Sequence, residues 1–395
     1  MMDRPQLHTT GVAKGGAAIA RDADGRVVFV RGALPDEVVI AEIVETKRDY
    51  ATAELREVIE PSPWRIEPPC PAVAAGCGGC DWQHASLEGQ RALKVRIVDD
   101  ALERVARLLD HPPIDIVALP GVAYRTTVRG VVRDRHFAFR RRASHDAVRV
   151  ATCLVAHPLL DALIREGDFG TCQEVTLRCG TATGERLVIA SPRAKGISVA
   201  DGVAVVGRDA LRRGAASFIH EEVSGVRFRV SARSFFQARA DGAAALVEAV
   251  GHYVEDLPGD GVAIDLYAGV GLFAATALAR WPDVVAVEQS VSSVGDCRLN
   301  APSARVVRGD VDQWRPEPAS VVVADPARQG LGPTAADRVA ATGTPRVVLV
   351  SCDAAAFGRD VALLEARGYG LQALRVVDLF PQTSHVEVVS RFDRR

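Results

Sequence analysis

From about residue 241 onward, the sequence alternates short apolar runs with stretches of helical periodicity. The apolar runs fall at 262–267, 284–288, 304–308, 320–324, 346–351, 371–378 and 385–392. Strands that alternate with helices fold into a parallel sheet covered on both faces, so this region predicts a doubly wound α/β domain. A short turn-like segment separates the last two runs, and we expect them to form an antiparallel pair at the sheet edge.

The first of these strands runs into a glycine loop, Tyr267-Ala268-Gly269-Val270-Gly271, and we expect a helix over 272–279. Glycines let the backbone approach a ligand closely, and the start of a helix favours electron-rich groups. Glu288 ends the next strand, where an acid can bind ribose hydroxyls. The loop therefore predicts a cofactor site.

Two classes of cofactor fit this loop. Gly269-x-Gly271-x-x-Ala274 matches the fingerprint of nicotinamide and flavin dinucleotides. However, Asp265 lies before the first glycine, where methyltransferases commonly place an acid near the amino-acid part of S-adenosylmethionine (SAM). The antiparallel pair at the end of the sheet is also typical of methyltransferases. We favour SAM, with a dinucleotide or no cofactor as alternatives.

Two further acids follow strands of this sheet. Asp325 comes directly after the fourth strand, at the edge where ligands bind in such sheets, and we expect it to contact substrate or cofactor. A plain Asp-Pro turn is the alternative for Asp325. Asp310 follows the third strand and can either face an adenine ring or cap a helix.

A thiol and a late carboxylate form a candidate catalytic pair. Cys352 stands where the apolar run at 347–350 stops, and Glu387 follows near the end of the chain. A cysteine at the carboxyl end of a buried strand can act as a nucleophile, and a carboxylate can act as its general base. Free cysteine is also among the most buried residue types, so an inert thiol and an unrelated acid are the alternative.

The rest of the chain predicts two further domains. Short strands separated by glycine- and proline-containing turns indicate a small β-barrel over residues 1–62. A proline-rich stretch then leads into residues 63–240, which read as a central α+β domain with a helix at 89–109. The α/β domain occupies residues 241–395.

The central region opens with a compact group of thiols, Cys70, Cys77 and Cys80, and Cys153 is a candidate fourth member. Four thiolates can hold a [4Fe–4S] cluster or a zinc ion, and spacing alone does not separate the two. The remaining cysteines lack partners at useful spacing, and we expect Cys172, Cys179 and Cys297 in the core.

Residues 121–150 are locally basic although the net charge of the chain is −2. Arginines there can bind RNA phosphates and the interleaved Phe137 and Phe139 can stack on bases. The alternative is a solvated arginine face over buried phenylalanines. The candidate RNA-binding residues are Arg125, Arg129, Arg140, Arg141 and Arg142.

Composition narrows the class of protein. Hydrophobic residues make up 48% of the chain and charged residues 25%, which is enough for large cores and argues against general disorder. No apolar run approaches the length of a membrane span, and the first residues lack an apolar signal core. We therefore expect a cytoplasmic protein with reduced thiols, no membrane association and a monomeric state.

Taken in order, these motifs resemble the bacterial RNA uracil-5-methyltransferases, iron–sulfur enzymes that use SAM to make 5-methyluridine in ribosomal or transfer RNA. The resemblance covers nearly the whole chain. It implies that the first segment is a TRAM domain, an OB-like RNA-binding barrel, and that Cys352 is the nucleophile and Glu387 the base. It also implies a [4Fe–4S] cluster on Cys70, Cys77, Cys80 and Cys153, and SAM contacts from Gln237, Tyr267, Glu288 and Asp325.

Several positions depart from the family pattern. The first cysteine gap is six residues where about five are expected, and Asp-Pro-Ala-Arg replaces Asp-Pro-Pro-Arg. Arg239 and Leu272 stand where the family has asparagine, and Asp353-Ala354 replaces Asn-Pro after the nucleophile. A carboxylate beside the thiol would raise its pKa, so we expect Asp353 to point away or to be offset by a neighbouring charge.

The resemblance implies methyl transfer from SAM to C5 of a uridine in RNA, with 23S ribosomal RNA as the first expected target, through a covalent bond between Cys352 and C6. A 5-methyluridine methyltransferase of transfer RNA is the nearest alternative. A SAM methyltransferase acting on protein or on a small molecule is the second. A non-catalytic RNA-binding or iron–sulfur sensor protein is the third.

Overall fold

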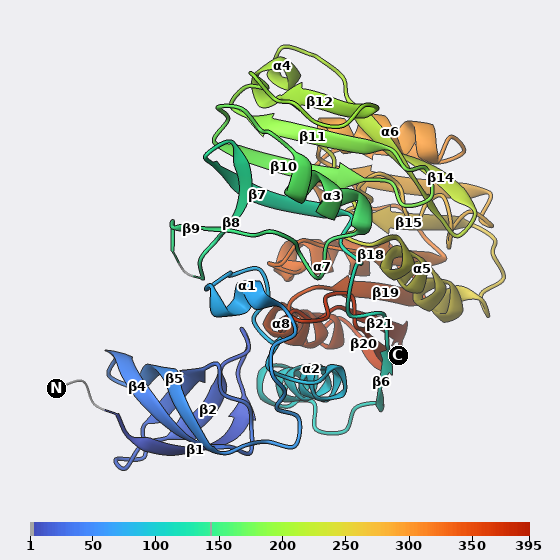
Figure 1. Ribbon diagram of the computed structural model, residues 1–395. Coiled ribbons are helices and arrows are strands. Elements are labelled where there is room, and N and C mark those ends of the chain that lie inside the picture. Colours follow the sequence, from blue (N-terminus) through green and yellow to red (C-terminus); the bar gives the residue numbers. More distant parts are fainter. Residues whose placement is uncertain (1–3, 143) are drawn as a thin grey trace.

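The computed structural model describes residues 4–142 and 144–395 (Figure 1). Its first five strands close into a barrel, which confirms the predicted small barrel, and their order is β1-β2-β3-β5-β4. Alternate residues of each strand point inward, and small side chains such as Ala18, Val28 and Ala51 fill the narrow interior. The strands are β1 (Gln6–Val12), β2 (Ala18–Arg21), β3 (Val27–Arg31), β4 (Val38–Thr46) and β5 (Tyr50–Glu60).

A six-stranded central sheet has the order β12-β11-β10-β7-β8-β9, and its apolar face packs under α3 (Pro158–Glu166). A separate hairpin of β13 and β14 packs against α6 (Val291–Asn300) of the C-terminal unit. The strands are β7 (Thr127–Arg133), β8 (His136–Arg140), β9 (Ala147–Arg149), β10 (Glu174–Cys179), β11 (Arg186–Ser191), β12 (Val203–Gly207), β13 (Phe218–Val223) and β14 (Val226–Ser231). The short helices are α1 (Pro71–Ala74) and α4 (Arg208–Arg212).

The C-terminal sheet has eight strands in the order β17-β16-β15-β18-β19-β21-β20-β6. Residues of its strands alternate between two apolar cores, one on each face, which confirms the predicted doubly wound α/β architecture. The strands are β6 (Ile114–Val117), β15 (Val262–Leu266), β16 (Asp283–Glu288), β17 (Arg305–Arg308), β18 (Val321–Ala324), β19 (Arg346–Ser351), β20 (Tyr369–Val377) and β21 (Val388–Arg394). The helices are α5 (Ala240–Val254), α6 (Val291–Asn300), η2 (Val311–Gln313), α7 (Gly332–Ala341) and α8 (Ala354–Glu365).

The antiparallel pairing of β20 and β21 is confirmed, but its predicted place at the sheet edge is wrong. β6 pairs in parallel with β20 and forms the outer strand. α2 (Leu87–Ala101) continues into a π-helical turn, η1 (Leu102–Ala106), and packs on α8 through Leu93, Ile97 and Val98. Residues 87–117 thus extend the C-terminal unit, whereas the sequence pattern placed them in the central domain at 63–240. The apolar stripe of a helix does not specify which sheet the helix will cover.

The helix predicted over 272–279 is also wrong. This segment forms consecutive turns, whose hydrogen bonds span four residues at Ala275, three at Thr276 and five at Leu278. A regular α-helix needs an unbroken four-residue repeat. Within residues 4–142 and 144–395, no helix is long and apolar enough to cross a membrane.

Candidate active site

A cleft of about 510 Å³ lies at one edge of the C-terminal sheet. Parallel strands β15, β16, β18 and β19 all end there, and antiparallel β21 begins there, so residues far apart in sequence meet. Seven of the predicted site residues line this cleft: Gln237, Tyr267, Gly269, Glu288, Asp325, Cys352 and Glu387. The expected candidate nucleophile, base and cofactor loop therefore share one cavity.

The backbone of the cofactor loop adopts positive φ angles, which glycine accommodates most easily. Tyr267, Gly269 and Gly271 have φ values of +62°, +56° and +89°. Gly269 N–H donates to Glu288 Oε2 at 2.9 Å, and Ser290 N–H donates to Oε1 at 2.6 Å, which fixes the carboxylate at the cleft wall. Gly271 packs against α6 instead, since a Cβ there would lie 2.9 Å from the sulfur of Cys297.

Asp265 lies beneath the loop and is fully buried. One carboxylate oxygen accepts the Ala274 N–H at 2.9 Å, and the other has no hydrogen-bond partner. Burial raises the pKa of Asp265 to about 8, and the charges of Asp325 and Glu288 add to this effect. A buried acceptor without a partner is costly unless a ligand supplies the donor, so this carboxylate fits the cationic amino group of SAM.

Three titratable side chains meet at the catalytic end of the cleft. Burial raises the pKa of the Cys352 thiol to about 12, with further contributions from the charges of Glu387 and Asp325, and Arg328 opposes the rise. Burial also raises the pKa of Asp325 to about 7. The pKa of Glu387, which is only 3% exposed, lies well above its ordinary value, first through burial and then through the charge of Asp325.

Asp353 points away from the thiol, which is one of the two expected outcomes. Its Oδ1 accepts the Ala356 N–H at 2.9 Å and caps α8, and its Oδ2 pairs with Lys14 Nζ of the barrel at 2.6 Å. Burial alone would raise the pKa of Asp353, but Lys14 and the capping N–H outweigh it, so its pKa is lowered. The Asp353 carboxylate therefore serves helix α8 and the barrel contact.

Four residues singled out in the sequence do not line the cleft: Asp265 and Gly271, described above, and Asp310 and Arg239. Asp310 Oδ1 accepts the Asp312 N–H at 3.0 Å and caps η2, which is the alternative expected for this residue. Arg239, which replaces an asparagine of the family pattern, is buried against the Tyr124 ring at 4.4 Å and forms an ion pair with Asp241. Its role here is structural.

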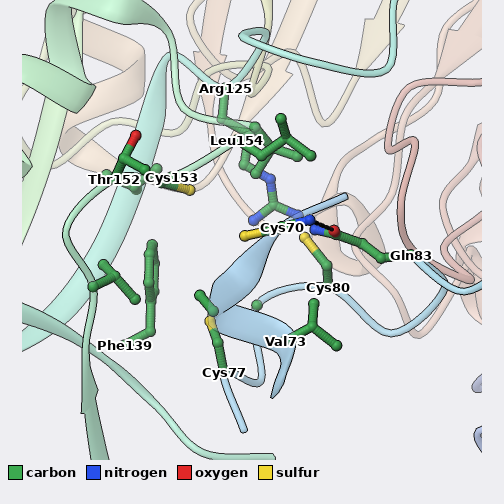
Figure 2. A pocket seen from close by; sticks show the side chains of 15 residues that line it. Cys70, Val73, Cys77, Cys80, Gln83, Arg125, Phe139, Thr152, Cys153 and Leu154 are labelled. Carbon is green, nitrogen blue, oxygen red and sulfur yellow. Dashed lines mark hydrogen bonds between the residues drawn. The ribbon is translucent and has the colours of Figure 1, made fainter. Parts of the chain in front are cut away.

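The four candidate thiol ligands line one cavity between α1 and the central sheet: Cys70, Cys77, Cys80 and Cys153. Figure 2 shows these side chains with the Arg125 guanidinium among them. Burial raises the pKa of Cys80 to about 11 and also raises that of Cys77 and Cys153, and Arg125 opposes each rise. In the part of the chain that the structure describes, no three histidine, cysteine or acidic side chains are arranged around a single metal ion.

The arginines of the basic segment at 121–150 lie in different surroundings and do not form one continuous surface. Arg129 and Arg140 both pair with Glu174, at 2.6 and 3.0 Å. Arg125 belongs to the wall of the cysteine cavity, and Phe137 is fully buried, so the alternative of buried phenylalanines holds for that ring. Arg141 and Arg142 are exposed.

A second groove, of about 900 Å³, runs between the barrel and the cysteine loop. Sequence reasoning missed it because its walls come from widely separated regions of the chain: the barrel, the cysteine loop, the central region and the segment before Glu387. Its cations and rings include Lys14, Arg31, Arg125, Arg142, Phe29 and Tyr50. His385 lines both this groove and the catalytic cleft, so the two cavities adjoin.

Arg328 was also missed as a site residue. It lines the cleft and is the cation that opposes the raised pKa of both Cys352 and Glu387. Its position three residues after Asp325, in the loop that follows β18, is a signal that sequence reasoning could have used.

Comparison with known proteins places the chain in a family. Residues 9–55 match the model of the TRAM domain. An uncharacterized RNA methyltransferase of Streptomyces avermitilis is 34% identical, over 96% of this chain and 95% of the relative. Another uncharacterized RNA methyltransferase, from Gloeobacter violaceus, is 32% identical over 98% of this chain and 95% of the relative.

The fold has a full-length counterpart among solved structures. The Pyrococcus abyssi tRNA (uracil-54, C5)-methyltransferase, in complex with S-adenosyl-L-homocysteine, superposes with a TM-score of 0.74. The match covers 98% of this chain and 99% of that one at 21% identity, so it supports the fold. With the curated relatives, these findings show that the chain belongs to the RNA methyltransferase family and carries an N-terminal TRAM domain.

Proposed function

We propose that this RNA methyltransferase transfers the methyl group of SAM to C5 of a uridine in RNA. The observation that carries the proposal is the shared cleft, in which Cys352 and Glu387 face the cofactor loop. The pairing of a thiol with a carboxylate is what a C5 methylation of uracil requires, because C5 is a poor nucleophile. The name of the P. abyssi neighbour supports the same chemistry.

SAM, when bound, supplies an electrophilic methyl group. The Cys352 thiolate adds to C6 of uracil, which makes C5 electron-rich enough to take that methyl group. Glu387 then accepts the C5 proton, the C5–H electron pair re-forms the C5–C6 double bond, and the C6–S bond breaks to free the thiolate. Arg328 favours the thiolate form of Cys352.

The experiment is methyl transfer from SAM with a labelled methyl group to unmodified transcripts of 23S ribosomal RNA and of transfer RNAs, followed by nuclease digestion. We expect label in 5-methyluridine, first from the ribosomal transcript. Transfer RNA is the second candidate, which the name of the P. abyssi protein favours. Label in another nucleoside, or in protein or small molecules of an RNA-free extract, would contradict the proposal.

The raised pKa of Cys352 predicts a pH dependence in the free enzyme. A thiol with a pKa of about 12 gains thiolate about tenfold per pH unit throughout the range below that value. Alkylation of Cys352 by iodoacetamide should therefore keep accelerating from about pH 7 to about pH 10, beyond the ordinary thiol pKa near 8.5. Peptide mass spectrometry gives the rate, and a plateau near pH 9 would contradict the prediction.

The groove beside the barrel fits a path for RNA. Its arginines can contact phosphates, and Phe29 and Tyr50 offer rings on which bases can stack. Arg142 belongs to the groove itself, and we propose that Arg140 and Arg141 assist from the adjoining surface. A uridine in a structured RNA must be unstacked to reach Cys352, at a cost of a few kcal/mol.

Removing the charge of Arg142 is expected to weaken RNA binding and to lower the slope of log affinity against log salt by about one. Arg129→Gln is the matched control, because Arg129 lies outside the groove, and each arginine has an acidic partner: Glu174 at 2.6 Å for Arg129 and Asp81 at 3.8 Å for Arg142. Filter binding of the RNA transcript over a range of salt concentrations measures both variants. Equal slopes for Arg142→Gln and the unchanged protein would contradict a contact between Arg142 and RNA.

We propose that the four thiols around one cavity hold an iron–sulfur cluster, as the family resemblance implies, with a zinc ion as the alternative that four thiolates also allow. A cluster spreads its ligands around a larger body, and Arg125 would offset part of its negative charge. Anaerobically purified protein should contain iron and sulfide in equal amounts and lose both in Cys80→Ser; zinc alone would contradict this assignment.

A further inference from the structure

The segment Cys80–Gln83 lies between the cysteine cavity and the loop that leads to Glu387. Cys80 and Gln83 line that cavity. The next residue, Asp81, turns its carboxylate the other way: Oδ1 accepts the Ser384 N–H at 3.0 Å and Oδ2 accepts the Ser384 hydroxyl at 2.7 Å. Ser384 is three residues before the candidate base, so one carboxylate holds both donors of that residue.

Backbone bonds strengthen the same junction. The N–H groups of Asp81 and Trp82 both donate to Gln382 O, each at 3.1 Å. Further along, the Tyr124 hydroxyl donates to Pro381 O at 2.8 Å. The segment that follows Cys80 thus holds the loop before Glu387, and Asp81 makes side-chain hydrogen bonds to it only three residues before Glu387.

The barrel packs on this junction as well. Trp82 Nε1–H donates to Gly16 O at 3.0 Å, and Gly16 has a φ of +82°. A Cβ at Gly16 would lie 2.6 Å from Trp82 Nε1 and 2.9 Å from Ser384 Cβ, so a glycine is required for this approach. Asp81 therefore stands where three parts of the molecule meet, and Ser384 has little freedom to move while Asp81 holds it.

We propose that Asp81 is a positioning residue for the base Glu387 and that it links the cysteine cavity to the last step of the reaction. The inference rests on the proposed function, since it concerns the step in which Glu387 accepts the C5 proton and Cys352 leaves C6. Loss of the Asp81 bonds displaces the Glu387 carboxylate, and displacement of a reacting group by about 1 Å costs up to about 100-fold in rate.

We expect Asp81→Ala to slow only the step in which Glu387 removes the C5 proton. Asp81→Ala should turn over uridine RNA roughly 10- to 100-fold more slowly and accumulate covalent RNA–protein adduct. With the same transcript made with 5-fluorouridine, both the variant and the unchanged protein stop before proton removal, because fluorine cannot leave C5 as a cation. At saturating RNA, trapping of this transcript by Asp81→Ala should match the unchanged protein, since Cys352 and the cofactor loop are intact. Saturation is required because Asp81 lines the groove beside the barrel and lies 3.8 Å from Arg142.

Glu221→Ala is the control for a general loss of stability. Glu221 accepts the N–H and the hydroxyl of Thr181 at 2.8 and 3.0 Å, as Asp81 does from Ser384, and also the N–H groups of Ala182 and Glu222, in a part of the central region away from the cleft. We expect its turnover and adduct level to stay unchanged. Slow trapping of the fluorinated RNA by Asp81→Ala, or normal turnover of uridine RNA, would overturn the proposal.

Hydrogen–deuterium exchange tests the link to the cysteine cavity without an activity assay. Asp81→Ala and Cys80→Ser should both speed exchange over residues 378–387, whereas Glu221→Ala should not. Unchanged exchange in Cys80→Ser would overturn the link. If the unchanged protein forms no adduct with fluorinated RNA at all, the proposed covalent mechanism fails instead, so the two failures are distinguishable.

Discussion

Replacing Cys352 with alanine is expected to abolish methyl transfer, with a loss of roughly 10³-fold or more in kcat, while SAM binding stays within about twofold. The thiol and the cofactor loop line the same cleft but belong to different strand ends, β19 and β15. Without the thiol, C5 of uracil cannot become nucleophilic. Without any change to Gly269 or Glu288, the cofactor contacts remain.

Two measurements check this expectation: label transfer to RNA, and SAM affinity by calorimetry. Cys172→Ala serves as the control, because Cys172 is a buried thiol of the central core whose S–H donates to Phe169 O at 2.9 Å. It should reduce stability and leave turnover per folded molecule intact. Near-normal turnover in Cys352→Ala would disprove the covalent mechanism.

Replacing Glu387 with glutamine is expected to stall the reaction after bond formation. Glutamine keeps the shape of the side chain but cannot accept the C5 proton, so Cys352 cannot leave C6. A covalent RNA–protein adduct should therefore accumulate and migrate slowly on a denaturing gel, while multiple turnover falls by roughly 10²- to 10⁴-fold. Absence of adduct in this variant, with SAM and RNA both bound, would count against Glu387 as the base.

The environment of Glu387 explains why a carboxylate suits this step. Its pKa is raised well above the ordinary value, first by burial and then by the charge of Asp325. A base is most effective when its pKa lies near the working pH. Because the base must be deprotonated, turnover should fall as the pH is lowered through this raised pKa, at a higher pH than an ordinary carboxylate would give.

Much of the fold follows from local pattern. The alternation of apolar runs after residue 241 predicted the strands of the C-terminal sheet to within about two residues, apart from the later start of β21. Strand ends also predicted the cleft, because the carboxyl ends of parallel strands meet at one edge. Tyr267, Asp325 and Cys352 were thus placed together by the order of the elements alone.

Other features depend on contacts that local pattern does not encode. The strand β6 completes the C-terminal sheet from more than a hundred residues upstream, and its apolar residues would suit either sheet. The segment 272–279 has helical composition, but its backbone forms turns of mixed length. The groove lined by Lys14, Arg142 and His385 exists only where the barrel, the cysteine loop and the catalytic cleft come together.

The sequence by itself determined the family, the α/β sheet, the candidate nucleophile and base, and the group of thiols, because each depends on residue type and spacing within a segment. The tertiary structure alone decided the direction of each side chain. Asp353, beside the nucleophile, turns to Lys14 and caps α8, and Asp81, beside a candidate cluster ligand, turns to Ser384. A side chain's partner across a domain junction is set by packing, and packing is a property of the whole fold.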